Sequence, residues 1–370
     1  MPVAVINGAR VHYVQLGGAS EDQEDLVMVH GLATNLAFWY LPYAIELSAR
    51  YRVTLYDLRG HGRSETTSAG YRPADLAADL HGLLDHLGIG RAHFLTHSFG
   101  GVVALRFACQ FPQRIASLVI ADTHIAAARG AGTSPAWRDS ARIQGILDDA
   151  GLALDARDPY FGYQLLTEVA RLHVHGAFVP PALAELVAPL RLRRTRFVSY
   201  DIDPSGRVAP LGGLGSKTAA QWLELMDRTS ARSELMGDDG LGLEELRRLR
   251  FPILAMYGDQ SQARLTGEEL LSVWPHAVFR RVRHAGHFFP TTRAREVIAD
   301  CTRFWDGEFA ETTRQRTGEH SERHFRSDRI YESDSGWFCL TRETDPLGPY
   351  PAPDDARRAL ASHISSMAST

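Results

Sequence analysis

The segment Thr96-His97-Ser98-Phe99-Gly100-Gly101 joins two stretches of different periodicity. Residues 91–95 before it are typical of a buried strand, and residues 99–110 after it have helical spacing. A serine at a sharp strand-to-helix turn projects its hydroxyl above the sheet, and the N–H of Phe99 can then point at an oxyanion. The segment therefore predicts a serine nucleophile elbow. An ordinary helix N-cap is the alternative, because helices prefer serine at that position without any catalytic role.

Length and composition favour a large globular domain with an appendage. The chain has 370 residues, of which 44% are hydrophobic and 23% charged, and its formal net charge of −4 argues against nucleic acid as the main partner. Cys109, Cys301 and Cys339 lie far apart, which predicts neither a disulfide framework nor a zinc ribbon and fits a reducing compartment. His173 and His175 have no third metal ligand at a suitable spacing, so we expect no metal and no cofactor.

The order of the expected elements predicts an α/β fold with an inserted helical region. Strands and helices alternate over residues 1–122 and again over 248–306, which implies a mostly parallel sheet flanked by helices. Residues 123–247 have helical spacing and predict a helical cap. Residues 307–327 are polar and predict a linker. Residues 328–370 predict a small C-terminal α+β module, too short to bury much core alone, that docks on its own chain or binds a peptide or protein.

The amino terminus suggests a location in the cell. It has no signal-peptide pattern, and no stretch approaches the roughly 20 apolar residues that span a bilayer. We therefore expect a cytoplasmic protein without a membrane span.

Two further loops carry residues suited to acyl transfer through a serine, which needs a base, an orienting carboxylate and donors to the oxyanion. His287 follows a late strand, and Gly286 before it allows a tight loop that brings the imidazole over the sheet. We prefer His287 to His284, because His287 lies beyond that glycine. The N–H of Leu32, after an apolar run, is expected to join that of Phe99 in an oxyanion hole.

Taken in order, these motifs resemble the α/β-hydrolase superfamily, closest to its capped enol-lactonase, epoxide-hydrolase-like and esterase branch. The resemblance covers about residues 3–306 and implies the α/β-hydrolase fold with a helical cap. The C-terminal residues are similar to small bacterial modules. The residues that carry the resemblance to the superfamily are His30-Gly31, Trp39, Asp57-Leu58-Arg59-Gly60-His61-Gly62-Arg63-Ser64, His97-Ser98-Phe99-Gly100-Gly101 and Gly286-His287.

The chain departs from the family pattern at the acid. The family's carboxylate usually lies three residues beyond the glycine that ends the penultimate strand, and here Gly258-Asp259-Gln260-Ser261 places a serine there. Asp259 lies in the same loop but two residues early. Asp122 ends the strand after the nucleophile helix, where some members of the superfamily supply their acid. We favour Asp122, and Asp259 stays open. A second departure is Thr96, which replaces the usual glycine two residues before the serine.

The resemblance implies a serine hydrolase that cleaves a carboxylic ester or lactone of a small or medium acyl substrate through an acyl-enzyme on Ser98. Two alternatives stay open. The same site could serve C–C hydrolysis, acyl transfer or cyclisation, or the chain could be a degenerate member that binds a ligand or protein. The aromatic side chains that could form the walls of the substrate pocket, or equally belong to the core, are Phe38, Trp39, Trp222 and Phe288.

Overall fold

The computed structural model divides into two units, residues 1–314 and 315–370. It describes residues 2–20, 22–128, 140–156, 158, 161–174, 214–261, 263–311, 330–333, 336–339, 347–352, 354–355, 358–360 and 362.

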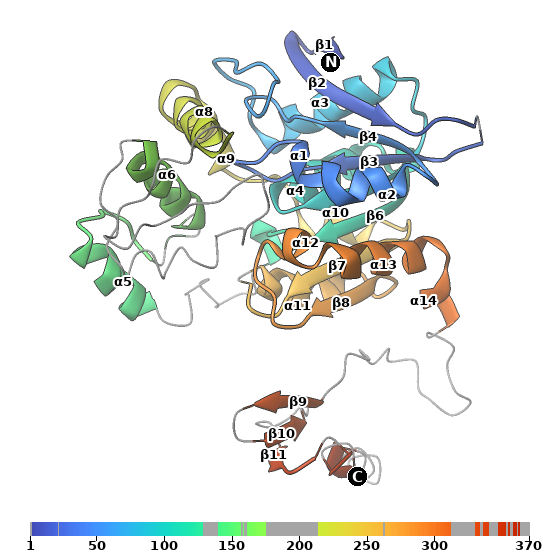
Figure 1. The fold of residues 1–370 in the computed structure, drawn as a ribbon, viewed down its shortest axis with the longest axis vertical. Coiled ribbons are helices and arrows are strands. Elements are labelled where there is room, and N and C mark those ends of the chain that lie inside the picture. The colour runs from blue at the N-terminus through green and yellow to red at the C-terminus, as the bar shows by residue number, and fades with distance from the viewer. Residues whose placement is uncertain are drawn as a thin grey trace. The chain divides into compact units, whose positions relative to one another are not determined.

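The first unit is built on an eight-stranded sheet of order β1-β2-β4-β3-β5-β6-β7-β8 (Figure 1). The pairs β1–β2 and β2–β4 are antiparallel, and every pair from β4–β3 to β7–β8 is parallel, so the predicted mostly parallel sheet is confirmed. The strands are β1 (Val3–Ile6), β2 (Ala9–Leu16), β3 (Asp25–Val29), β4 (Arg52–Tyr56), β5 (Ala92–His97), β6 (Ile115–Ala121), β7 (Ile253–Gly258) and β8 (Val278–Val282).

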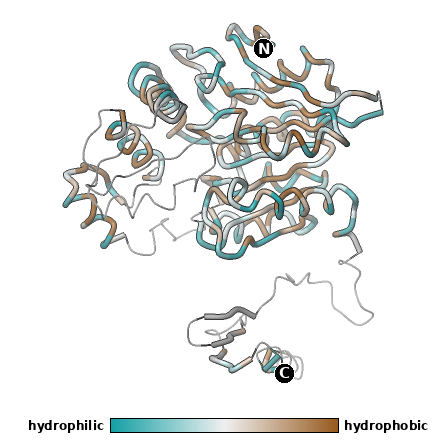
Figure 2. Tube along the Cα trace, viewed as in Figure 1, coloured by the Kyte–Doolittle hydropathy of each residue, from teal (hydrophilic) through white to brown (hydrophobic). Residues whose placement is uncertain are grey.

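Helices cover both faces of the sheet, which explains why its central strands are continuous apolar runs. Side chains alternate along a strand, so Val27 packs toward α3, α4 and α11 whereas its neighbour Leu26 packs toward α1, α2 and α13. Figure 2 shows hydrophobic positions recurring along these strands. The covering helices are α1 (Ala37–Trp39), α2 (Ile45–Leu47), α3 (Pro73–His86), α4 (Phe99–Gln110), α11 (Arg264–Val273), α12 (Phe289–Thr292), α13 (Ala294–Trp305) and α14 (Glu308–Glu311), with short helical turns η1 (Tyr40–Ala44) and η2 (Pro112–Arg114).

Between β6 and β7 the described residues form helices and no strand. Two side chains fasten them to the loop after β4. Glu234 accepts hydrogen bonds from the N–H groups of Gly70 and Tyr71 (3.1 and 2.7 Å), and Gln221 donates to the carbonyl of Gly62 (3.1 Å). These elements are η3 (Ala126–Ala128), α5 (Ser140–Asp149), α6 (Phe161–Val174), α8 (Leu214–Arg228), α9 (Ala231–Leu235) and α10 (Leu243–Arg247).

The second unit has a three-stranded antiparallel sheet of order β11-β10-β9, made of β9 (Ile330–Ser333), β10 (Gly336–Cys339) and β11 (Leu347–Tyr350). Cys339 is buried against Leu347, Tyr350 and the helical residues Ala359 and Leu360. Most of the predicted linker, from residue 312 on, lies outside the described residues, and α14 covers its first part.

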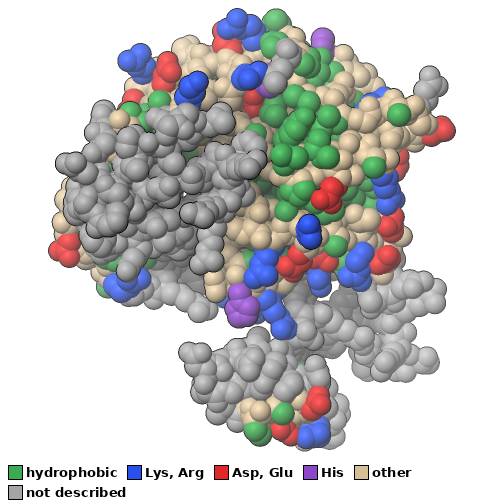
Figure 3. Space-filling view, viewed as in Figure 1, with side chains coloured by type: hydrophobic (Ala, Val, Ile, Leu, Met, Phe, Trp, Pro, Cys, Tyr) green, Lys and Arg blue, Asp and Glu red, His purple; other side chains and the backbone are tan. Residues whose placement is uncertain are grey.

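The surface of the first unit has mixed polarity. On the face in Figure 3, positive and negative side chains are interspersed, and hydrophobic side chains gather over the α1–α2 segment, where Leu41 and Ile45 are exposed. Among the described helices, none is both long and apolar enough to cross a membrane.

Candidate active site

Ser98 lies at the sharp turn between β5 and α4. Its backbone has φ 53° and ψ −126°, a conformation that costs a residue other than glycine roughly 1–3 kcal/mol. Two hydrogen bonds of 2.9 Å fix the turn: the N–H of Ser98 donates to Ala121, and the N–H of Gly101 donates to the carbonyl of Ser98. A strained serine between a strand and a helix has the geometry of a nucleophile elbow.

Thr96 fits into the turn although the motif usually has glycine at that position. Its side chain is fully buried, and its Oγ1 donates a 2.9 Å hydrogen bond to the carbonyl of Val119 on β6. The neighbouring strand therefore both leaves room for the side chain and satisfies its hydroxyl.

Gly100 allows α4 to approach β3 closely. A Cβ atom at this position would lie 2.5 Å from the carbonyl oxygens of both Val29 and His30, which belong to the backbone and cannot rotate away. We expect Gly100→Ala to lower the free energy of unfolding by about 2–3 kcal/mol, measured by urea unfolding.

Gly90→Ala is the matched control for Gly100→Ala. A Cβ atom at Gly90 would meet nothing within 4 Å, so this change should stay within about 0.5 kcal/mol. Equal stability of the two variants would contradict the steric explanation.

His287 connects Ser98 to a buried carboxylate. Its Nε2 lies 3.0 Å from Ser98 Oγ, and its Nδ1 lies 2.7 Å from Asp122 Oδ2. Asp122 follows β6 and is fully buried, and the His287 side chain is 29% exposed. The serine hydroxyl can donate to Nε2 while Nδ1–H donates to the carboxylate. This is the order of hydrogen bonds that base-assisted attack by a serine requires.

The buried carboxylate of Asp122 accepts hydrogen bonds from three surrounding groups. Oδ1 accepts the N–H of Gly258 at 2.9 Å, and Oδ2 accepts the hydroxyl of Ser261 in addition to Nδ1–H of His287. The backbone N–H of Asp122 donates to Met256 (2.8 Å), so β7 holds both the backbone and the side chain. Three donors compensate for the loss of water around a buried charge.

The two other candidates in these loops have different surroundings. Asp259 Oδ1 accepts the N–H of Ala285 at 3.2 Å, and its own N–H donates to Val282 (3.0 Å), which links the loops after β7 and β8. His284 is exposed and has a positive φ of 50°. The carboxylate that is hydrogen-bonded to His287 is that of Asp122.

The loop after β3 runs alongside the serine. A Cβ atom at Gly31 would lie 3.0 Å from Cβ of Ser98, which places the start of the Leu32 segment next to the nucleophile. His30 holds this loop: its Nε2 accepts the N–H of Leu58 (3.0 Å), so the proton of the neutral ring is on Nδ1, 2.7 Å from the carbonyl of Gly31. Burial lowers the pKa of His30, which agrees with a neutral ring.

The N–H of Phe99 is the other expected oxyanion donor. It belongs to the first residue of α4, where N–H groups have no acceptor within the helix. The two N–H groups predicted as oxyanion donors thus belong to the start of α4 and to the loop that begins at Gly31.

The aromatic candidates for the pocket walls occupy different places. Phe38 stacks on His97 with ring centroids 4.6 Å apart, and Phe288 lies 5.1 Å from the His287 ring. Trp39 is fully buried in the core, with its ring against Phe38 and Tyr43. Trp222, on α8, is 2% exposed and donates its indole N–H to Thr167.

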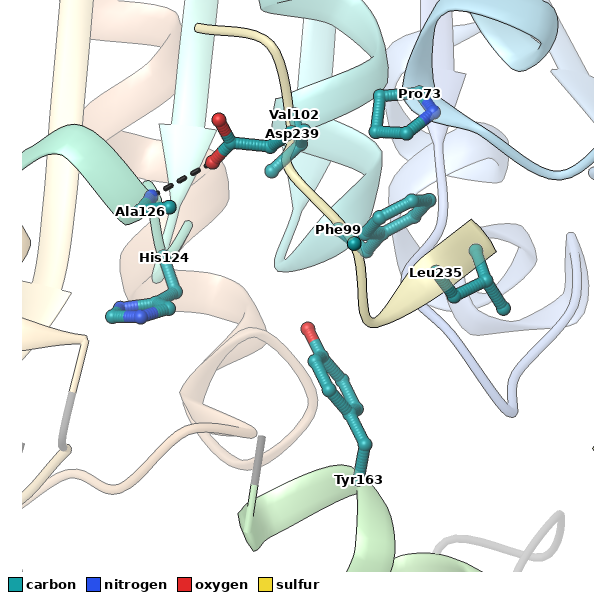
Figure 4. A pocket seen from close by; sticks show the side chains of 9 residues that line it. Pro73, Phe99, Val102, His124, Ala126, Tyr163, Leu235 and Asp239 are labelled. Carbon is teal, nitrogen blue, oxygen red and sulfur yellow. Dashed lines mark hydrogen bonds between the residues drawn. The ribbon is translucent and has the colours of Figure 1, made fainter. Parts of the chain in front are cut away.

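A pocket adjoins the elbow on the side of Phe99 (Figure 4). The hydroxyl of Tyr163, on α6, points toward the space between Phe99 and His124. Asp239 accepts the N–H of Ala126 at 2.7 Å and lies at another edge. No sequence pattern points to Tyr163, His124 or Asp239, because these residues come together only when the helices pack onto the sheet. The lining residues are Pro73, Phe99, Val102, His124, Ala126, Tyr163, Leu235, Gly237 and Asp239.

The loop after β4 is held by a second buried carboxylate. Asp57 accepts hydrogen bonds from His12 Nδ1 (2.7 Å) and from the N–H groups of Leu36 (2.7 Å) and Arg63 (2.9 Å). Burial raises the pKa of Asp57, but these donors and the nearby His30 outweigh it, so the pKa lies below its usual value. The network ties the loop that contains Leu32 to the sheet.

His61, in the same loop, is buried with a neutral ring. Its Nδ1–H donates to the carbonyl of Arg59 (3.0 Å), and the ring lies 6.1 Å from that of Trp222. Burial, assisted by the nearby His30, lowers the pKa of His61 from 6.5 to about 4.

We expect this lowered pKa to destabilise the protein in mild acid. Between about pH 6.5 and pH 4 the unfolded chain binds a proton at His61 and the folded chain does not, so stability falls as the pH falls through this window. The difference corresponds to at most about 3 kcal/mol. His61→Asn, whose amide can still donate to Arg59, should reduce the loss between pH 7 and pH 4.5 in urea unfolding. The exposed His284→Asn should not, and equal losses in both variants would contradict this expectation.

The described residues hold no group of three or more His, Cys, Asp or Glu side chains placed to bind a metal ion. Of the two histidines on α6 and beyond it, His175 and the side chain of His173 lie outside the described residues.

The mostly parallel eight-stranded sheet, the helices on both of its faces and the serine at the turn between β5 and α4 are the features of the α/β-hydrolase fold. Residues 26–294 match the family of the α/β hydrolase fold, and the chain belongs to that family. Residues 315–369 match a second family, a domain of unknown function (DUF6316). The resemblances predicted from the sequence are therefore confirmed for the superfamily and for the separate C-terminal module.

Individual relatives cover only part of the chain. It is 40% identical over 111 residues to the "Putative carbamate hydrolase RutD" of Pantoea ananatis, covering 30% of this chain and 40% of the relative. It is 35% identical over 133 residues to 3-oxoadipate enol-lactonase 2 of Acinetobacter baylyi, covering 36% and 47%. The matched parts thus span less than half of each relative.

A solved structure supports the fold over a longer range. The enol-lactonase from Burkholderia xenovorans LB400 is similar with a TM-score of 0.55 and 22% identity, covering 82% of this chain and all of that one. At this identity the likeness shows the fold alone.

Proposed function

We propose that this chain is a serine hydrolase that cleaves a carboxylic ester or lactone of a small or medium acyl substrate. The observation that carries the proposal is the unbroken hydrogen-bond chain from Ser98 Oγ through His287 to the buried carboxylate of Asp122. Its three members follow β5, β6 and β8, so the carboxyl ends of parallel strands bring them to one edge of the sheet.

In the proposed reaction, Ser98 Oγ attacks the substrate carbonyl while His287 Nε2 takes the hydroxyl proton. Asp122 keeps the proton of the neutral imidazole on Nδ1 and stabilises the imidazolium that forms. The tetrahedral intermediate collapses to an acyl-enzyme as the leaving alcohol takes the proton from Nε2. Water then attacks the acyl group with the same base, which regenerates Ser98 and releases the acid. One ester and one water thus give one acid and one alcohol.

The N–H groups of Leu32 and Phe99 are the proposed donors to the oxyanion. Leu32 belongs to a loop that His30 and the Asp57 network hold in place. Phe99 is the first residue of α4. A single such donor can stabilise the transition state by roughly 3 kcal/mol.

Two observations bear on the class of acyl substrate. The pocket next to Phe99 is lined by apolar side chains such as Val102 and Leu235, together with the polar side chains of His124, Tyr163 and Asp239. The similar proteins have names that refer to a lactone and a carbamate, both of which contain an acyl carbonyl bonded to a heteroatom.

The first experiment is labelling with a fluorophosphonate probe, which reacts with an activated serine. Wild type should be labelled on Ser98, and Ser98→Ala and His287→Ala should not, with circular dichroism showing that all three are folded. A folded but unlabelled wild type would contradict the proposal and favour a ligand-binding role. A panel of lactones, short-chain esters and carbamates then identifies the substrate, and C–C hydrolysis or acyl transfer becomes the better assignment if labelling succeeds and none is hydrolysed.

A further inference from the structure

Ser261 contacts the carboxylate of Asp122 at the atom that serves His287. Its Oγ donates to Asp122 Oδ2, the same oxygen that lies 2.7 Å from His287 Nδ1. Ser261 follows β7 and Asp122 follows β6, so this contact joins neighbouring strand ends of the parallel sheet.

The direction of the Ser261 hydroxyl is fixed from its other side. Ser261 Oγ accepts the N–H of Ala263 at 3.2 Å, so its own proton is directed to Asp122. The N–H of Ser261 also donates to the carbonyl of Gly258 (3.0 Å), the residue whose N–H holds Asp122 Oδ1. The turn from Gly258 to Ser261 therefore holds both oxygens of the carboxylate.

We infer that Ser261 is a positioning residue that holds Asp122 Oδ2 where His287 Nδ1–H needs it. The inference rests on the proposed function, and it adds that Ser261 acts through Asp122 without touching the substrate. It also follows that the side chain of residue 261 lies within hydrogen-bond distance of the position that Asp122 Oδ2 occupies beside His287. An aspartate at that position, one bond longer than serine, could supply that oxygen if Asp122 were absent.

The kinetic test is a double-mutant cycle read by the rate of fluorophosphonate labelling. Ser261→Ala should slow labelling about tenfold in the wild-type background, the effect of one lost hydrogen bond to a charged group, whereas Ser261→Thr should retain most of the rate. In an Asp122→Asn background the same change should cost less than about twofold, because Ser261 then has no carboxylate to position. A merely structural role would slow both backgrounds equally and overturn the inference.

Ser272→Ala is the matched control for Ser261→Ala. Ser272 is an exposed serine on α11 whose hydroxyl donates to Glu269, so the labelling rate should be unchanged.

A second measurement needs no turnover and so separates this inference from the proposed function. The Nδ1–H of His287 should give a low-field proton resonance that moves in Ser261→Ala and disappears in Asp122→Gly, where glycine suits the positive φ of 54° and vacates the carboxylate's space. In Asp122→Gly/Ser261→Asp the resonance should return, together with at least a tenfold gain in labelling over Asp122→Gly. Failure of the resonance to move or return would overturn the inference even if wild type hydrolyses esters. A wild type without labelling but with these shifts would overturn only the proposed function.

Discussion

Ser98→Ala should lower kcat for any ester or lactone that this protein cleaves by about a million-fold, and His287→Ala should lower it about as much. The first variant lacks the atom that attacks. The second lacks the base that lies 3.0 Å from Ser98 Oγ and without which the hydroxyl is a weak nucleophile. Because the two residues act as one unit, the double variant should be little worse than either single variant.

The measurement is the turnover of the best substrate of the panel. His284→Ala is the matched control for His287, because His284 lies three residues away and is exposed. Its kcat should change by less than about twofold, in line with the small effects of surface substitutions. Ser98→Ala with more than a few per cent of wild-type turnover would exclude Ser98 as the nucleophile.

The sheet could be predicted from the sequence because its signals are local. Apolar runs such as residues 26–29 and 118–121 mark strands buried on both faces, and the structure has β3 and β6 there. Parallel strands share one carboxyl edge, so Ser98 and His287 were expected to lie near each other, and a 3.0 Å contact joins them.

The surroundings of the acid could not be predicted, because they depend on details of two loops. Asp122 and Asp259 both follow strands that end at the same edge. What separates them is the backbone direction: Asp122 has φ 54° and its side chain reaches His287, whereas the carboxylate of Asp259 turns to the N–H of Ala285. The hydrogen bond from Ser261 likewise depends on the turn over residues 258–261.

The contacts that side chains of the helical region make with the sheet could not be predicted either. Helical spacing indicates that residues between β6 and β7 are helical, but not which side chain meets the sheet. Tyr163 reaches the pocket beside Phe99, more than sixty residues away in the sequence, and Trp222 packs near His61. Such contacts depend on how the helices dock.

Asp122→Asn should lower kcat by about ten-thousand-fold, the loss found in serine proteases when the orienting carboxylate becomes an amide. In this protein Asp122 Oδ1 accepts the N–H of Gly258, while Oδ2 faces His287 Nδ1. An amide has one acceptor oxygen and cannot serve both. If its oxygen stays with Gly258, its NH₂ faces Nδ1 and favours the tautomer with the proton on Nε2, which cannot take the proton of Ser98. If the amide is reversed, its NH₂ meets the N–H of Gly258 in a buried site without an acceptor.

Asp259→Asn tests the alternative acid with the same chemical change. Asp259 Oδ1 accepts the N–H of Ala285, and an amide oxygen can replace that acceptor, so kcat should fall less than about threefold. Measuring kcat for both variants on one substrate, with urea unfolding to show that each is folded, decides between the two aspartates. A ten-thousand-fold loss in Asp259→Asn with little change in Asp122→Asn would reverse the assignment. Losses below a few-fold in both would mean that neither carboxylate orients His287 during the reaction.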